Sequence, residues 1–132
     1  IRNPKSIRPW QHVLEPLSGY LIALGFGNDL AYNFGPKEAS DLKVLEVVDL
    51  FRRNLEFNFQ VSEPEQMQYE AALLSLDSTF ANLKLAWNPT YSQVEAINMT
   101  GEWWKMAFTD CNLVEFTRSQ IHNFISLQST SV

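Results

Sequence analysis

The chain of 132 residues lacks the common motifs of catalysis. It contains no G-x-x-G-x-x-G or G-x-G-x-x-G run, and such a run forms the phosphate loop of dinucleotide-binding domains. None of its four tyrosines is followed by lysine four residues later, so the Tyr-x-x-x-Lys acid–base pair is missing. A G-x-S-x-G nucleophile elbow is absent as well. We therefore expect neither a catalytic residue nor a cofactor-binding residue in this chain.

Cysteine and histidine are scarce. The single cysteine, Cys111, excludes an intrachain disulfide, and its neighbours Asp110 and Asn112 bring no cation that would activate a thiolate. The two histidines, His12 and His122, lie far apart in the sequence and give no metal-ligand spacing. We expect an ordinary reduced thiol and no metal site.

Basic residues are outnumbered. Ten Lys and Arg stand against 15 Asp and Glu, for a net charge of −5, which argues against a nucleic-acid partner. A small anionic ligand stays compatible with this charge, because one well-placed arginine can bind a diphosphate. The sequence has neither an apolar run of about 18 residues nor a signal-peptide pattern. We expect a cytoplasmic protein without a membrane partner.

Large apolar residues are plentiful, with 45% hydrophobic content, four Trp and nine Phe. This composition and length predict one globular domain over residues 1–132. Periodicity predicts helices and short strands in alternation, which favours a small mixed α/β domain. The helices are expected at 15–25, 41–55, 78 to about 88, 92 to about 108, and 112–127; the extended segments or strands are expected at 7–13, 30–34, 56–61 and 71–76.

Two helix starts carry capping signals. Ser40 is a plausible N-cap for the helix 41–55. Ser92 with Glu95 forms the capping box of the helix expected at 92 to about 108. The helix after Ser92 is apolar on two sides, which is typical of a helix buried between layers or exposed to a partner. We interpret its Trp103–Trp104 pair as packing and not as a cofactor site.

A polar and aromatic cluster, Arg8-Pro-Trp-Gln-His12, precedes the helix expected near Pro16. An arginine, an aromatic plane and a helix N-terminus together suit a nucleotide diphosphate. The alternative is structural: Trp10 belongs to the core, Arg8 pairs with a nearby Glu, and His12 is a buried histidine with its hydrogen bonds satisfied. Asn33, in Tyr-Asn-Phe-Gly, is likewise typical of a turn at the end of a strand.

Four segments, in order along residues 1–108, carry a family resemblance. The longest is Arg8-Pro-Trp-Gln-His-Val-Leu-Glu-Pro-Leu-Ser-Gly-Tyr-Leu21, and the shorter ones are Ala31-Tyr-Asn-Phe-Gly-Pro36, residues 69–77 followed by 85–89, and Thr100-Gly-Glu-Trp-Trp104. Together they resemble CDP-glucose 4,6-dehydratases, members of the extended short-chain dehydrogenase/reductase superfamily. The tail 109–132 resembles that family more loosely. The resemblance implies the C-terminal substrate-binding half of such a protein, without a Rossmann domain.

The resemblance also implies roles for single residues. Arg8 and Asn33 match the superfamily's contacts to the substrate diphosphate, and Gln11 and His12 lie in the same substrate-binding segment. The family uses NAD to dehydrate a CDP-hexose, but the NAD site and the Tyr/Lys pair belong to the half that is missing here. The resemblance therefore implies a CDP-sugar-binding domain, a lyase fragment that is inactive as an isolated chain.

Two hypotheses follow for the partner. The chain is either an excised piece that packs on an NAD-binding domain, or a free-standing interaction module. In the second case it would form a homo-oligomer through the face that the NAD-binding domain normally covers, since exposed apolar patches drive association.

Overall fold

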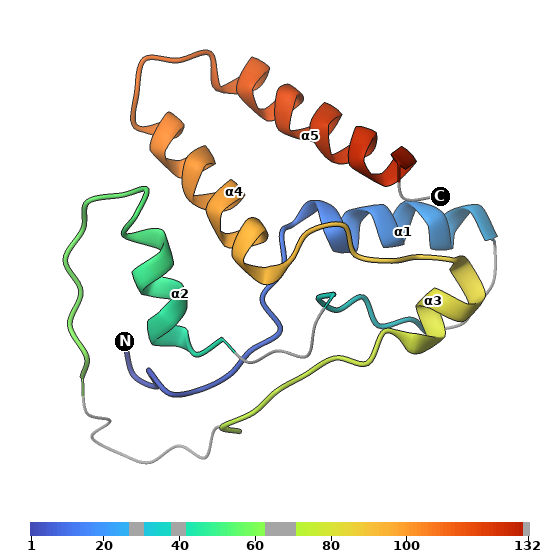
Figure 1. Ribbon diagram of the computed structural model, residues 1–132, viewed down its shortest axis with the longest axis horizontal. Coiled ribbons are helices and arrows are strands. Elements are labelled where there is room, and N and C mark those ends of the chain that lie inside the picture. The colour runs from blue at the N-terminus through green and yellow to red at the C-terminus, as the bar shows by residue number, and fades with distance from the viewer. Residues whose placement is uncertain (27–30, 38–41, 63–70, 131–132) are drawn as a thin grey trace.

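Helices make up the regular structure of the part of the chain that can be described (Figure 1). The computed structural model describes residues 1–26, 31–37, 42–62 and 71–130. In chain order, the helices within these ranges are α1 (Leu14–Phe26), α2 (Val44–Phe51), α3 (Thr79–Leu85), α4 (Gln93–Ala107) and α5 (Leu113–Thr130). None of these helices combines the length and the hydropathy needed to cross a membrane.

The expectation of a mixed α/β domain is wrong. The β-pairing within the described ranges consists of two isolated bridges, which join Ile7 to Lys43 in antiparallel and to Leu73 in parallel orientation. A strand is stable when a neighbouring strand satisfies its backbone groups over several residues, and single-residue bridges do not build such a ladder. The described chain is therefore mostly helical and contains no sheet.

The predicted strands fail for a common physical reason. Alternating apolar residues at 56–61 indicate a face that could be buried, yet Phe57 and Val61 are exposed and the segment is irregular. The run at 71–76 is exposed along its whole length. Leu30 lies outside the described residues, and residues 31–34 form no strand. A period of two predicts a strand only where a neighbouring element offers a surface to cover it.

The helix predictions are confirmed in outline, because a helix satisfies most of its backbone groups within one segment. The helix expected at 41–55 is the shorter α2, which begins after Lys43, and Ser40 lies outside the described residues. The capping box at the start of α4 is present: the Glu95 amide donates to Ser92 Oγ (3.3 Å), and the Ser92 amide donates to Glu95 Oε2 (2.8 Å).

Helix α4 lies between α2 and α5, which explains its two apolar sides, and α1 packs against α3 (Figure 1). One side of α4 brings Ile97 to the α2 residues Val47 and Leu50. The other brings Ala96 and Met99 to Phe124 of α5.

The two adjacent tryptophans of α4 have different surroundings. Trp103 packs toward α5, where its indole Nε1–H donates to Thr117 Oγ1 at 2.9 Å. Trp104 is 47% exposed and stacks on Phe108, which is itself exposed. The packing interpretation therefore suits Trp103, whereas Trp104 faces solvent.

The described chain has three small apolar cores. The first joins α1 and α3 around Trp87, the second joins α2 and α4, and the third joins the beginning of α1 to α4 and α5. The buried residues are Phe34, Ala81, Leu85 and Trp87 in the first core, Val47, Leu50 and Ile97 in the second, and Tyr91, Ala96 and Phe124 in the third.

The segment from Arg8 to Leu14 connects these three cores. Trp10 packs against the α2–α4 core, and Leu14 packs against the core around Tyr91. Gln11 is hydrogen-bonded to the backbone of Phe34, a member of the α1–α3 core. The segment with the strongest family resemblance thus lies at the centre of the packing.

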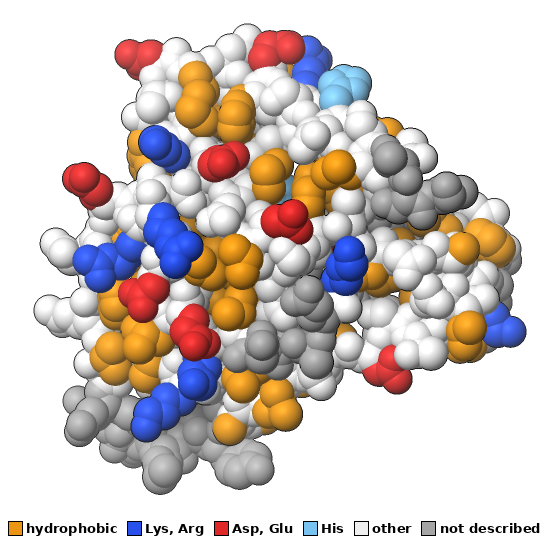
Figure 2. Space-filling view, viewed as in Figure 1, with side chains coloured by type: hydrophobic (Ala, Val, Ile, Leu, Met, Phe, Trp, Pro, Cys, Tyr) orange, Lys and Arg blue, Asp and Glu red, His pale blue; other side chains and the backbone are white. Residues whose placement is uncertain are grey.

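Many large apolar side chains nevertheless remain exposed. On the face drawn in Figure 2, apolar side chains reach the surface at several places between charged ones. One further set lies on α1, whose only charged residue, Glu15, is buried. The exposed apolar side chains of α1 are Leu17, Tyr20, Leu21, Leu24 and Phe26.

Candidate functional site

Arg8 is half-buried, in an irregular segment after the Ile7 bridges. Its Nη1 donates to the Ile7 carbonyl at 2.7 Å, a contact that folds the guanidinium back against the neighbouring backbone. The guanidinium is partly exposed and stays protonated in proteins. Arg8 can therefore contribute a fixed positive charge at this surface.

Gln11 brings the two predicted diphosphate-binding segments together. Its side-chain Nε2–H donates to the Phe34 carbonyl at 2.8 Å. Phe34 directly follows Asn33, which is exposed. The hydrogen bond therefore places the Arg8–His12 segment beside the loop that carries Asn33. In this arrangement Gln11 connects the two segments, and its Oε1 is a buried acceptor for which no hydrogen-bond partner is found among the described residues.

His12 points into the protein. Its ring is buried and meets the edge of the Tyr91 ring, with 5.8 Å between the ring centroids. The Leu14 amide donates to His12 Nδ1 at 3.3 Å, and the Glu15 amide donates to the His12 carbonyl at 3.0 Å. Burial lowers the pKa of His12, because the charged imidazolium would lose its hydration. His12 therefore stabilises the beginning of α1 as a neutral histidine.

Two features expected of a nucleotide site have other roles in the structure. The Trp10 ring packs against the α2–α4 core, and its Nε1–H donates to the Leu42 carbonyl at 3.2 Å. The first two amide groups of α1 are occupied by His12, as described above. Neither the indole plane nor this helix N-terminus is therefore open to a phosphate. Of the four predicted site residues, Gln11 and His12 make contacts within the protein, and the candidate site is therefore reduced to Arg8 and Asn33.

Sequence reasoning missed Glu15, the most buried carboxylate of the described residues. It is 1% exposed, and both of its oxygens accept hydrogen bonds from the Thr90 amide at 3.0 Å. The Tyr91 amide donates to Oε1 at 2.7 Å. Burial raises the pKa of Glu15, against the opposing effects of these hydrogen bonds and of the Lys37 charge. The sequence signal that could have singled out Glu15 was its position between Leu14 and Pro16, inside the longest segment of family resemblance.

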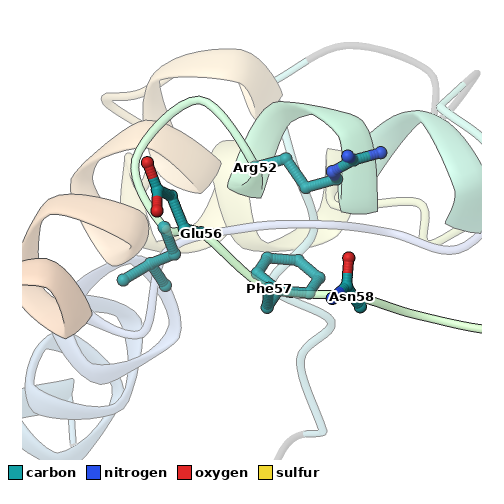
Figure 3. Close-up of a pocket in the computed structure, with 5 residues that line it drawn as sticks. Arg52, Glu56, Phe57 and Asn58 are labelled. Atoms are coloured by element: carbon teal, nitrogen blue, oxygen red, sulfur yellow. The ribbon is translucent and has the colours of Figure 1, made fainter.

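A separate pocket of about 430 Å³ lies after the end of α2. Its lining residues are Arg52, Leu55, Glu56, Phe57 and Asn58, so it includes none of the four predicted site residues. Figure 3 shows Arg52 on one side of the pocket and Phe57 with Asn58 on the other. The Arg52 guanidinium lies over the Phe59 ring at 5.7 Å from its centroid, an arrangement that holds the cation in place. The lining carries one cation, Arg52, and one carboxylate, Glu56.

Within the described ranges, no three His, Cys, Asp or Glu side chains lie close enough together to hold a metal ion. Cys111 is half-buried, and its Sγ–H donates to the Met106 carbonyl at 3.3 Å.

Comparison with known proteins confirms the resemblance seen in the sequence. The chain is 33% identical, over 137 aligned positions, to the CDP-glucose 4,6-dehydratase of Salmonella typhimurium strain LT2. The match covers 96% of this chain but 37% of that protein, so the chain spans little more than a third of its relative's length. This coverage is consistent with the C-terminal part of the enzyme. No protein-family model matches the chain.

Proposed function

We propose that this chain, a relative of CDP-glucose 4,6-dehydratase, binds a CDP-hexose and does not dehydrate it by itself. The relationship supports the ligand class, and the absence of the Tyr-x-x-x-Lys pair from the sequence supports the lack of independent catalysis. This sequence contains no phosphate-binding glycine loop for NAD, so NAD would bind to another part of a dehydratase-like protein. A cytoplasmic location belongs to the same proposal.

The observation that carries this proposal is the Gln11–Phe34 hydrogen bond. This bond ties the segment that carries Arg8 to the loop that carries Asn33, which supports a site shared by the two segments. The guanidinium of Arg8 would attract the two negative charges of the diphosphate, and the amide of Asn33 would donate to a phosphate oxygen. The partial exposure of Arg8 and the exposure of Asn33 leave this place accessible to a ligand.

Titration calorimetry of the purified chain tests this function. CDP-glucose should bind saturably at one site, and CMP should compete with it more weakly, because CMP lacks the second phosphate and the sugar. Glucose 1-phosphate tests the sugar-phosphate half alone. If CDP-glucose produces no saturable heat at millimolar concentration, the binding function is wrong for this chain.

A second candidate function is self-association, which the exposed apolar face of α1 favours. This face carries no charged side chain, and its two most exposed leucines, Leu21 and Leu24, are 72% and 77% exposed. An apolar surface of this kind loses contact with water when a second copy covers it. We propose that the same face would meet the NAD-binding domain in a longer dehydratase-like protein.

The solution mass of the chain tests the second candidate. Light scattering should show a dimer or larger species, and Leu21→Glu should shift it to the monomer by placing a charge in the interface. Val114→Glu makes the matched control, because Val114 is an exposed apolar residue on α5. A monomer at the highest soluble concentration, or an equal effect of both variants, would rule out association through α1.

A further inference from the structure

The carboxylate of Glu15 joins two distant parts of the chain. Its three backbone hydrogen bonds reach Thr90 and Tyr91, which lie 75 and 76 positions further along the sequence. A buried carboxylate is costly unless hydrogen bonds replace its hydration. Because these donors are backbone amides, the Glu15 carboxylate fixes the path of the backbone at residues 90–91.

Glu15 is also coupled to His12 of the candidate site segment, through its backbone amide and, by way of Tyr91, through its carboxylate. The Glu15 amide donates to the His12 carbonyl, and the His12 ring meets the edge of the Tyr91 ring. Tyr91 therefore contacts both residues, through its amide and through its ring. A shift of the turn at Tyr91 would displace His12, and with it the neighbouring Gln11.

A second connection to the loop of Asn33 starts at the backbone carbonyl of Glu15 and not at its carboxylate. Ser18 Oγ–H donates to the Glu15 carbonyl at 2.7 Å and accepts from Trp87 Nε1–H at 3.0 Å. The Trp87 ring meets the edge of the Phe34 ring, with 4.9 Å between centroids. The backbone of Phe34 in turn holds Gln11. Both segments of the candidate site are thus fixed to the chain between Trp87 and Tyr91.

We propose that Glu15 is a positioning residue of the sugar-nucleotide site, whose carboxylate fixes the turn at Thr90–Tyr91 and thereby sets Arg8 relative to Asn33. This inference rests on the proposed CDP-hexose-binding function. Glu15 itself is too buried to contact a ligand. The charge of Lys37, in the loop that carries Asn33, acts on Glu15 in the same sense as the hydrogen bonds and favours its ionised form.

Two isosteric substitutions separate positioning from stability. Glu15→Gln keeps one acceptor oxygen but presents an NH2 group to the backbone amides, so it loses part of the contact. Glu95→Gln is the control, because Glu95 accepts hydrogen bonds from Ser92 in the capping box of α4, next to the same turn. We expect Glu15→Gln to weaken CDP-glucose binding about tenfold, the size of one lost hydrogen bond. Glu95→Gln should leave the dissociation constant unchanged. Equal dissociation constants for wild type and a folded Glu15→Gln chain would overturn the proposal.

A ligand-independent measurement keeps the inference separate from the binding function. Indole hydrogen exchange followed by NMR reports on Trp87 and Trp10, with Trp103 of α4, which is bonded to Thr117 of α5, as the internal control. We expect Glu15→Gln to accelerate exchange at Trp87 and Trp10 and to leave Trp103 unchanged. If the wild-type chain binds no CDP-glucose, the binding function fails, but this readout still decides whether Glu15 positions the segment.

Unchanged exchange at Trp87 and Trp10 would contradict the positioning role. If Glu15→Gln loses its fold, all three indole groups will exchange rapidly together. Glu15→Asp then provides the milder variant: it keeps the charge but shortens the reach by one methylene. Selective acceleration at Trp87 and Trp10 in Glu15→Asp supports the role, and uniform acceleration of all three indoles contradicts it.

Discussion

The Gln11 side-chain amide donates a 2.8 Å hydrogen bond to the Phe34 carbonyl and connects two segments that lie 23 positions apart. These are the segments in which the sequence places Arg8 and Asn33. Neither helix periodicity nor composition indicates this contact. It joins two of the segments that carry the family resemblance, and the proposed function depends on it.

Replacing Gln11 by alanine should affect both stability and binding. The substitution removes the hydrogen bond to Phe34, and its expected cost is about 1 kcal/mol in the free energy of unfolding. CDP-glucose binding should weaken as well, because the two segments are no longer held together. Gln120→Ala is the matched control, since Gln120 Nε2–H makes an equivalent bond to the Met99 carbonyl, between α5 and α4. Urea unfolding should show similar losses for both variants, and calorimetry should show weaker binding for Gln11→Ala alone.

The tryptophans should differ strongly in their contribution to stability. Trp87 is 1% exposed and lies in the α1–α3 core, so Trp87→Ala should cost about 3–5 kcal/mol. Trp104 is half exposed, and Trp104→Ala should cost less than about 1 kcal/mol. Thermal and urea unfolding of the two variants measure the difference. A loss at Trp104 as large as that at Trp87 would mean that α4 is covered on its exposed side in solution.

Two glycines of α1 provide a test of packing within one helix. A Cβ at Gly19 would overlap the Phe34 ring, whereas a Cβ at Gly25 would meet open space. Gly19→Ala should therefore destabilise the chain by about 1–3 kcal/mol through overpacking. Gly25→Ala should stabilise it by about 0.5–1 kcal/mol, because alanine favours the helix. Urea unfolding followed by circular dichroism measures the sign of the change in the free energy of unfolding for each variant. A stabilising Gly19→Ala would contradict the contact between α1 and Phe34.

His12 should make stability depend on pH. Burial lowers its pKa in the folded chain below the ordinary value of 6.5, so the unfolded chain binds the proton more readily. The His12 contribution is therefore fully present above pH 6.5 and is lost as the pH falls from 6.5 through the folded pKa. His12→Asn retains an acceptor for the Leu14 amide and removes the titrating group. As the pH falls from 6.5 through the folded pKa, the free energy of unfolding of His12→Asn should fall less steeply than that of the wild type.

The control for this pH dependence is His122→Asn, since His122 is exposed on α5. Urea unfolding at closely spaced pH values measures all three chains. Identical pH profiles for His12→Asn and the wild type would show that His12 is not the buried neutral histidine described here.

The sequence predicts the helices well and the tertiary structure poorly. A capping box such as Ser92 with Glu95 is local, and both of its partners can be seen within four residues. The strand predicted at 56–61 fails because alternation does not reveal whether a neighbouring element covers Phe57 and Val61. Glu15 could not be distinguished from a surface acid, since its partners Thr90 and Tyr91 lie far along the chain.

The candidate site rests on the family resemblance. Family resemblance singled out Arg8 and Asn33, and their roles stay predictions. The residue types of Trp10 and His12 suit both a ligand site and a core, and the pattern left these alternatives open. The structure places both side chains inside the packing, because Trp10 meets the α2–α4 core and His12 meets Tyr91.

The most direct test of the account is calorimetric titration of CDP-glucose into Arg8→Ala and Arg52→Ala, side by side with the wild type. Both variants remove one arginine, but Arg8 belongs to the candidate site and Arg52 lines the separate pocket after α2. We predict that Arg8→Ala weakens binding by about 1.5–3 kcal/mol, the range for a charge-assisted hydrogen bond, and that Arg52→Ala has no effect. Weaker binding in Arg52→Ala together with unchanged binding in Arg8→Ala would contradict the account and place the ligand in the other pocket.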